Sequence, residues 1–208
     1  SRRTPAACST PRRSEWDTDN NQITAFHPGA MQQAHHIDLP PRDDLKIAII
    51  APDGREAMMR RAQQLADAGI PFVFDPGQQL PQFDGDELRR FLALASWVAV
   101  NDYEGRMLCE RTGLSLPSMS TLGLRGVIVT LGHEGCDLWI DGRCERIAGV
   151  AAEQVVDPTG CGDAFRGALL YGLERGWALE RCVELGNRVG ALKIAHRGGQ
   201  NHPVDRAA

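Results

Sequence analysis

The sequence has no apolar run that approaches the ~20 residues needed to cross a membrane, and no apolar signal-peptide segment near its start. It also lacks a strong charge of either sign, because its formal net charge at pH 7 is only −4. These absences argue against a membrane protein and against a general nucleic-acid binder. We therefore expect a cytoplasmic protein with neither a nucleic-acid nor a membrane partner.

Cysteine and histidine are present, but neither is spaced like a disulfide scaffold or a metal site. The six cysteines include no Cys-x-x-Cys pair, and several fall inside expected helices, so we expect reduced thiols. Three histidines occur close together, at His27, His35 and His36. We expect no metal there, because adjacent histidines in a loop rarely converge on one ion and no carboxylate or cysteine shares their spacing.

The first fourteen residues differ from the rest of the chain, since they hold four arginines, no acid and no aliphatic side chain larger than alanine. A segment of this composition does not contribute to a core. We therefore expect a basic disordered tail over residues 1–16, one domain over 17–203 and a short tail over 204–208. A basic arm for an anionic partner is the alternative interpretation of the first tail.

From residue 46 onward, apolar runs alternate with segments of helical periodicity, which is typical of a doubly wound α/β sheet flanked by helices. Asp53, with Glu56 three residues later, predicts a capping box at the start of the first helix. The expected strands are 46–51, 72–74, 97–100, 127–131 and 153–156, with a hairpin of 136–140 and 143–147. The expected helices are 53–68, 86–95, 102–112, 164–175 and 179–195.

The stretch from Asp157 to Asp163 reads Asp-Pro-Thr-Gly-Cys-Gly-Asp and places two glycines and an acid where a loop becomes a helix. Gly160 and Gly162 allow the backbone to approach a ligand closely, and the N–H groups of a helix start favour a phosphate. Asp163, in the first helical turn, is suited to take a proton from an attacking hydroxyl group. Alternatively, Asp163 only complements the helix dipole.

This stretch resembles the second signature of the ribokinase-like, or PfkB, family of sugar and nucleoside kinases, whose usual form is Asp-Thr-x-Gly-Ala-Gly-Asp. The resemblance implies a ribokinase-like fold and assigns Asp163 as the catalytic base. It also implies that the N–H groups of Gly160, Cys161 and Gly162 form an anion hole for the transferred phosphoryl group. Asp157 and Thr159 match positions that in many relatives help to hold a monovalent cation, so K⁺ is a further expected cofactor.

Asn101 and Glu104 close an expected strand and open an expected helix. Their spacing is that of an N-terminal capping box. In the family that the sequence resembles, an Asn-x-x-Glu at this point shapes the Mg²⁺ and phosphate site, with the glutamate acting through metal-bound water. The two interpretations are compatible, because Mg²⁺ keeps several waters and uses one or two carboxylates.

A glycine-rich turn from Thr130 to Gly135 follows the next strand and resembles the family's Thr-x-Gly-x-x-Gly turn, which implies nucleotide contacts from Thr130, Gly132 and Gly135. Asn187, on the last expected helix, matches an asparagine near the adenine. Small residues beside it could equally serve helix packing. Since ligands of open α/β sheets bind at the carboxyl ends of strands, we expect Asn101, Gly132 and the Asp163 loop to share one site.

Residues 19–31 resemble the lid strand of bacterial adenosine-kinase-like members of the family. The resemblance implies a small β lid over the substrate, with Gln22 and Phe26 as contacts, and a homodimer formed through the lid. The family's Gly-Gly-x-x-x-Asn loop, which grips the sugar hydroxyls, has no match before residue 20. We therefore expect a domain that is truncated at its N-terminus, with an unpaired inner edge of the sheet.

Together these features predict an ATP- and Mg²⁺-dependent kinase that phosphorylates a hydroxyl group of a small-molecule sugar or nucleoside, with adenosine favoured. An inactive nucleotide-binding relative without the sugar pocket is the alternative. A Rossmann-type oxidoreductase is a third candidate, but it needs a Gly-x-Gly-x-x-Gly after the first strand, where this chain has Ala51-Pro52-Asp53-Gly54.

Overall fold

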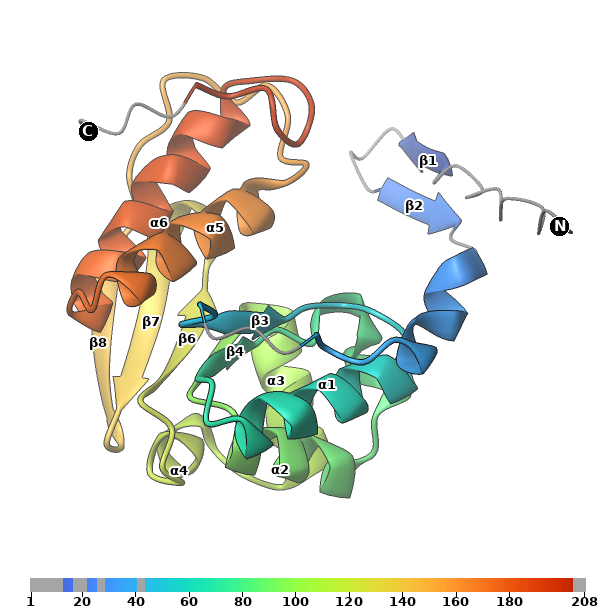
Figure 1. Cartoon of the computed structure of the whole chain (residues 1–208). Coiled ribbons are helices and arrows are strands. Elements are labelled where there is room, and N and C mark those ends of the chain that lie inside the picture. Colours follow the sequence, from blue (N-terminus) through green and yellow to red (C-terminus); the bar gives the residue numbers. More distant parts are fainter. Residues whose placement is uncertain (1–12, 17–21, 26–28, 41–43, 204–208) are drawn as a thin grey trace, which may run out of the picture.

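A computed structural model describes residues 13–16, 22–25, 29–40 and 44–203 of the chain. Most of these residues form one three-layer α/β domain, with a small two-stranded sheet apart from it (Figure 1). The strands are β1 (Arg13–Trp16), β2 (Gln22–Ala25), β3 (Ala48–Ile50), β4 (Phe72–Phe74), β5 (Trp97–Asn101), β6 (Gly126–Thr130), β7 (Gly135–Ile140) and β8 (Arg143–Ala148). The α-helices are α1 (Arg55–Asp67), α2 (Gly85–Leu94), α3 (Asp102–Thr112), α4 (Leu116–Ser120), α5 (Cys161–Glu174) and α6 (Leu179–Ile194). Three 3₁₀ helices complete the set, η1 (Gly29–His36), η2 (Gly77–Gln82) and η3 (Gly132–Glu134).

The main sheet has six strands in the order β3-β4-β5-β6-β7-β8. The first four strands are parallel, and β7 and β8 continue the sheet as an antiparallel hairpin. The hairpin turn matches the expected tight turn, because Asp141 and Gly142 both have positive φ, at 47° and 78°. Asn101 of β5 is the register partner of Thr130 of β6, so the two strands end side by side. The expected doubly wound α/β fold is confirmed.

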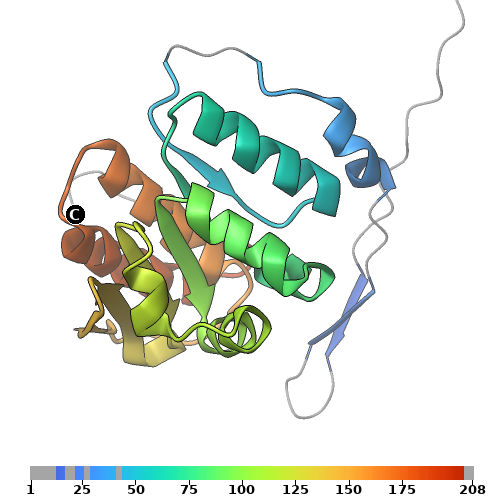
Figure 2. The ribbon, with the colours of Figure 1, turned by 90° about the horizontal axis from the view of Figure 1, so that it is seen from below.

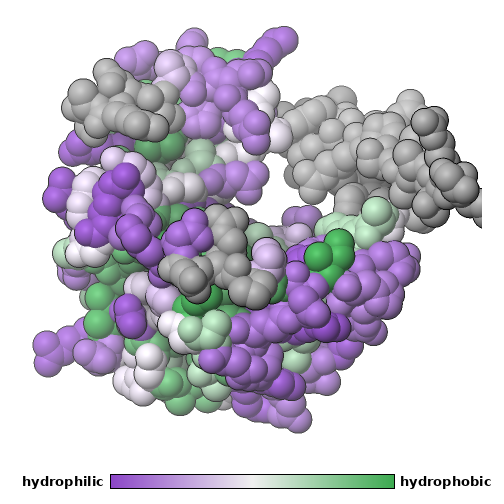
Figure 3. All heavy atoms as spheres, in the orientation of Figure 1, coloured by the Kyte–Doolittle hydropathy of each residue, from purple (hydrophilic) through white to green (hydrophobic). Residues whose placement is uncertain are grey.

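Side chains alternate between two cores along each central strand. Phe72, Phe74, Val98 and Val100 face the core that α1, α2 and α3 cover, whereas Val73 faces the other. The helices that cover that second core are α5 and α6, which pack closely together on the opposite side of the sheet (Figure 2). Strands buried on both faces read as continuous apolar runs, which is why the sequence marks them clearly. On the face shown in Figure 3, hydrophilic residues predominate, with smaller apolar areas between them.

Helix ends follow local sequence signals in most cases. Asp84 and Asn101 each form a capping box, with Glu87 and Glu104 respectively. Asp53 does not, although its spacing to Glu56 predicted one. Helix α1 begins at Arg55, two residues after the start of the expected range 53–68, and its N-cap residue Gly54 provides no side-chain cap. The Asp53 carboxylate instead accepts hydrogen bonds from Gly54 N and from Arg61.

Two further expectations need correction. Residues 153–156 form no strand, and Val155 is 76% exposed. Residues 13–16, expected within a disordered tail, form β1 and pair with β2 in register from Arg13↔Ala25 to Trp16↔Gln22. The rest of that tail lies outside the described residues, as do Phe26 and His27.

Three further features of the described residues are the edge of the sheet, the thiol groups and the character of the helices. Strand β3 pairs with β4 alone, so it forms one edge of the described sheet. The thiols of Cys109, Cys136, Cys144, Cys161 and Cys182 are free. Among the described residues, no helix has the length and apolar character to cross a membrane.

Candidate active site

The turn of Gly160–Gly162 forms the start of α5. Gly160 is the residue before the helix and has φ 81° and ψ 6°, a left-handed conformation that favours glycine. A Cβ atom at Gly160 would lie 2.9 Å from Cα of Gly199, so the turn also packs tightly against the chain after α6. No side chain caps the helix, and Cys161 N donates to Pro158 O at 3.2 Å. Within the described part of the chain, the N–H group of Gly162, expected in the anion hole, has no side-chain acceptor.

The Asp157 carboxylate holds this loop in place. Its Oδ1 accepts a hydrogen bond of 2.9 Å from Thr159 N, and its Oδ2 accepts one of 2.8 Å from Gly198 N. The N–H groups of Val156 and Asp157 both donate to Ile194 O, at the end of α6. The hydrogen bonds from Gly198 and Thr159 lower the pKa of Asp157 to about 2. The loop before Asp163 is thus fixed to the end of α6 at several points.

Lys193 contacts this loop, and the sequence analysis did not identify it. Its side chain is fully buried, and its Nζ donates to Asp157 O at 2.8 Å and to His196 O at 3.0 Å. A buried ammonium needs such acceptors to offset its desolvation. Asp157 and Thr159, expected to help hold a monovalent cation, therefore lie in a loop whose backbone already contacts a cation of the chain itself. The only feature of the sequence that could have indicated this buried cation is a lysine on the apolar face of α6.

Asp163 lies in the first turn of α5 and is exposed. It has no hydrogen-bond or ion-pair partner among the described residues, since the neighbouring Arg166 turns to Asp75 instead. A carboxylate at a helix start, free of a cationic partner, is available to accept a proton from a ligand. This placement is the one that the sequence predicted for the base.

Asp75 and Arg166 form an ion pair that sequence reasoning missed. Asp75 directly follows β4 and is buried, and its Oδ1 accepts a hydrogen bond of 2.8 Å from Nη2 of Arg166 on α5. Burial, with smaller contributions from the charges of Glu104 and Asp163, raises the pKa of Asp75 to about 6 in spite of Arg166. Those two carboxylates therefore lie near Asp75, so the ends of β4 and β5 and the start of α5 meet at one edge of the sheet.

Asn101 and Glu104 lie at this edge and are bonded to each other. Asn101 N donates to a carboxylate oxygen of Glu104 at 2.8 Å, and Glu104 N donates to the Asn101 side chain at 2.8 Å. The predicted capping box is therefore confirmed, and it holds Glu104 at the carboxyl end of β5. The described residues contain no group of three His, Cys, Asp or Glu side chains that could hold a metal directly. Carboxylate oxygens at this edge suit a Mg²⁺ ion that keeps most of its waters.

The glycine-rich turn after β6 needs its glycines. Gly132 has φ 61° and Gly135 has φ 102°, and a Cβ atom at Gly135 would clash with Ile147 O of β8. Leu131 N donates to Gly135 O at 2.8 Å, which closes the turn. Thr130 Oγ1 faces Val100 O at 3.4 Å. The turn follows β6 directly beside Asn101, as the register of β5 and β6 requires.

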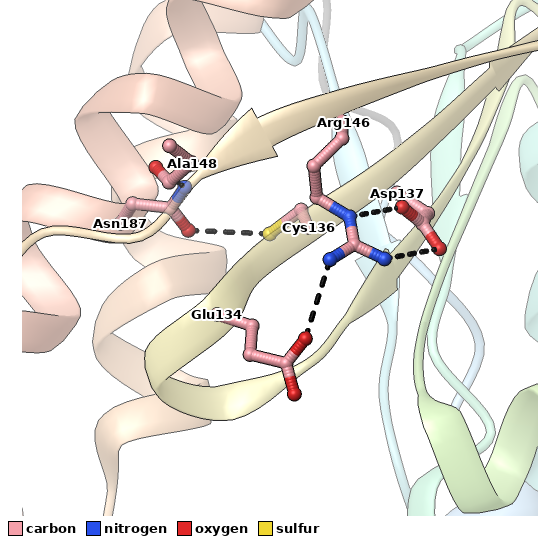
Figure 4. Close-up of polar contacts among 6 residues, drawn as sticks. All are labelled: Glu134, Cys136, Asp137, Arg146, Ala148 and Asn187. Carbon is pink, nitrogen blue, oxygen red and sulfur yellow. Dashed lines mark hydrogen bonds and ion pairs between the residues drawn. The ribbon is translucent and has the colours of Figure 1, made fainter.

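Asn187 links α6 to the hairpin (Figure 4). Its Nδ2 donates to Ala148 O at 3.0 Å, and its Oδ1 accepts from the thiol of Cys136 at 3.2 Å. On the hairpin itself, Arg146 pairs with both Asp137 and Glu134. Asn187 is thus held against the carboxyl end of β8, and it retains one amide hydrogen outside these bonds.

Gln22 and the histidines His35 and His36 are the other described residues that the sequence analysis singled out. Gln22 belongs to β2, in the two-stranded sheet that Figure 1 shows apart from the main domain. His35 and His36 end η1, where His35 lies 3.4 Å from a carboxylate oxygen of Glu56.

Comparisons with known proteins agree with this geometry. The family model described as pfkB family carbohydrate kinase matches residues 14–206. A nucleoside kinase of Burkholderia thailandensis, solved in complex with inosine, is 48% identical and superposes with a TM-score of 0.89, covering 94% of this chain and 65% of that one. The same enzyme solved with ADP-inosine superposes with a TM-score of 0.88. A nucleoside kinase of Methanocaldococcus jannaschii is 27% identical over 89% of this chain and 61% of its own length. The chain thus spans about three fifths to two thirds of the length of these relatives.

Proposed function

Because the chain belongs to the pfkB family of carbohydrate kinases, we propose that the protein transfers the γ-phosphoryl group of ATP to a hydroxyl group of a nucleoside. The observation that carries this proposal is the placement of Asp163, exposed and without a partner among the described residues, in the first turn of α5. A nucleoside is favoured over a free sugar because the 48% identical relative is a nucleoside kinase. Adenosine and inosine are the first acceptors to test.

The geometry of the loop supports the following roles for the chain's own groups. Asp163 takes the proton of the acceptor hydroxyl, whose oxygen attacks the γ-phosphorus while the bond to the β,γ-bridging oxygen breaks and ADP leaves. The backbone N–H groups of Gly160 and Gly162 would stabilise the charge on the transferred group, whereas the N–H group of Cys161 already donates to Pro158 O. Glu104 would hold Mg²⁺ through water, and that ion would offset the charge of the triphosphate.

The nucleotide would lie over the turn of Thr130–Gly135 and beside Asn187. The turn follows β6, at the carboxyl edge of the sheet where ligands of open α/β sheets bind. Asn187 is held at the end of the hairpin that continues this edge. A lid over residues 19–31, which include β2, remains a prediction, with Gln22 and Phe26 as substrate contacts and a homodimer formed through it.

The test is a thermal-shift and phosphotransfer experiment on the purified protein with Mg·ATP and adenosine, inosine, ribose or fructose. A ligand that binds only the native state raises the melting temperature by mass action. We expect a shift with ATP, a further shift with one nucleoside, and ADP formed in step with the phosphorylated nucleoside. A shift with ATP and no transfer to any acceptor would instead identify a nucleotide-binding relative without kinase activity.

A further inference from the structure

The ion pair of Arg166 and Asp75 has a fixed geometry. Nε and Nη2 of Arg166 both face the Asp75 carboxylate, and the Nη2–Oδ1 distance is 2.8 Å. The Arg166 side chain is 15% exposed and that of Asp75 is 5% exposed. Nη2 donates the hydrogen bond, whereas Nε lies within ion-pair distance of Oδ2 without forming a hydrogen bond. One hydrogen bond and the attraction of opposite charges therefore position the guanidinium.

The third nitrogen of Arg166, Nη1, lies beside Gly162. A Cβ atom at Gly162 would lie 2.6 Å from this nitrogen, so the guanidinium occupies the space that a side chain at Gly162 would need. Helical side chains lean toward the N-terminus of their helix, and residues four apart are neighbours on its surface. Arg166 therefore reaches back to the turn of Gly160–Gly162. Among the described residues, none accepts a hydrogen bond from Nη1.

Because Arg166 pairs with Asp75, it does not pair with Asp163, the proposed base. Asp163 precedes Arg166 by three residues on the same helix, a spacing at which aspartate and arginine commonly pair. Arg166 pairs with Asp75 instead. A carboxylate tied to a guanidinium is a weaker proton acceptor, because the opposite charge stabilises its ionised form. The buried carboxylate therefore keeps a cation close to Asp163 while leaving Asp163 unpaired.

We propose, on the basis of the function proposed above, that Nη1 of Arg166 donates a hydrogen bond to the phosphoryl group during its transfer. Asp75 is the positioning residue that directs the guanidinium toward the turn of Gly160–Gly162. Arginine suits this role because it stays charged and presents several donors to phosphate oxygens. If the pair only joined α5 to β4, its loss would lower stability without a selective effect on the terminal phosphate.

The kinetic test compares Arg166→Met, Arg166→Lys and Asp75→Asn with the wild type. We expect Arg166→Met to lower kcat by about 10²–10³-fold, the range for loss of one donor to developing charge, with the nucleoside KM within about threefold. Arg166→Lys, which keeps the charge, retains more activity, and Asp75→Asn lowers kcat by about tenfold. Arg61→Met, which breaks a comparable pair with Asp53 on α1, is the matched control and leaves kcat unchanged.

A binding measurement tests the same proposal without phosphotransfer. Calorimetric titration with Mg·AMP-PNP and with Mg·ADP is expected to show about tenfold weaker AMP-PNP binding by Arg166→Met, and ADP binding within about threefold of the wild type. The double variant Asp75→Asn/Arg166→Met replaces the single variant if the unpaired buried carboxylate prevents folding.

The outcomes separate the two proposals. Transfer by the wild type, with kcat and AMP-PNP affinity of Arg166→Met both within about threefold of the wild type, overturns the role of Arg166 alone. Arg166→Lys no more active than Arg166→Met also counts against a role for the charge. No transfer by the wild type overturns the proposed function, and the difference between AMP-PNP and ADP binding then still decides whether Arg166 contacts the terminal phosphate.

Discussion

The buried ammonium group of Lys193 donates a hydrogen bond of 2.8 Å to the carbonyl oxygen of Asp157. A cation of the chain itself is thereby fixed against the loop that leads to Gly160 and Asp163. The Asp157 carboxylate, on the same residue, binds the backbone N–H groups of Thr159 and Gly198. The carbonyl oxygen and the carboxylate of Asp157 thus both take part in hydrogen bonds that position the loop, and these bonds need no ligand.

This contact leads to a prediction about K⁺. If the Lys193 ammonium supplies the positive charge of the loop, phosphotransfer by the wild type proceeds equally in K⁺ and in choline buffers. Lys193→Met leaves the carbonyl oxygens of Asp157 and His196 without their donor and is expected to lower the free energy of unfolding by about 1–3 kcal/mol. Its residual activity should rise when K⁺ is added.

Initial rates in the two buffers and urea unfolding of both proteins check this prediction. Lys46→Met, which breaks an exposed ion pair with Glu174, is the control and changes stability by less than about 1 kcal/mol. A wild type that needs K⁺ would contradict the role of Lys193 and would support a K⁺ ion at Asp157 and Thr159.

Two glycines, Gly160 just before α5 and Gly167 within it, are expected to respond in opposite directions to alanine. Gly160→Ala is strained by its φ of 81° and by backbone contact with Gly199, and should lower stability by about 1–3 kcal/mol. Gly167, in the same helix, has open space where a Cβ atom would lie. Gly167→Ala should raise stability by about 0.5–1 kcal/mol, since alanine is the better helix former. Chemical denaturation of both variants measures the difference, and equal effects of the two changes would be inconsistent with the structure.

The buried carboxylate of Asp75 predicts a pH dependence of stability. Its pKa is raised from 3.8 to about 6 in the folded protein, so the folded state binds the proton more tightly than the unfolded state does. As the pH rises from about 4 to above 6, the contribution of Asp75 to the free energy of unfolding therefore falls by about 2–3 kcal/mol. Asp75→Asn should lack this fall. Denaturation at pH 4 and pH 7 measures it, and parallel changes in the two proteins would refute the assignment.

The regular elements could be predicted from sequence where burial is periodic. Strands β4, β5 and β6 are buried on both faces, and helix α3 begins at a capping box, so both patterns mark their bounds closely. Residues 153–156 were wrongly expected to form a strand because they carry two valines. In the structure no neighbouring strand offers a ladder to them, and Val156 N bonds to Ile194 O instead.

The contacts that complete the site could not be predicted. Arg166 and Asp75 are 91 residues apart, and nothing in the local pattern of either residue indicates the other. An acid directly after a buried strand, as at Asp75, is a usable signal, because such positions meet at one edge of a parallel sheet. Lys193 could not be predicted because the apolar pattern of its helix indicates only packing. Its acceptors are backbone carbonyl groups, which leave no mark in the sequence.

The most direct test of the account is the initial rate at which the γ-phosphoryl group of ATP is transferred to a nucleoside by the wild type and by Asp163→Asn. Asp86→Asn is the matched control, because Asp86 is also an exposed aspartate in the first turn of a helix. We predict that Asp163→Asn lowers kcat by about 10²–10⁴-fold at similar stability, while Asp86→Asn has no effect. Full activity of Asp163→Asn would contradict the account and leave Asp163 as a residue that only complements the helix dipole.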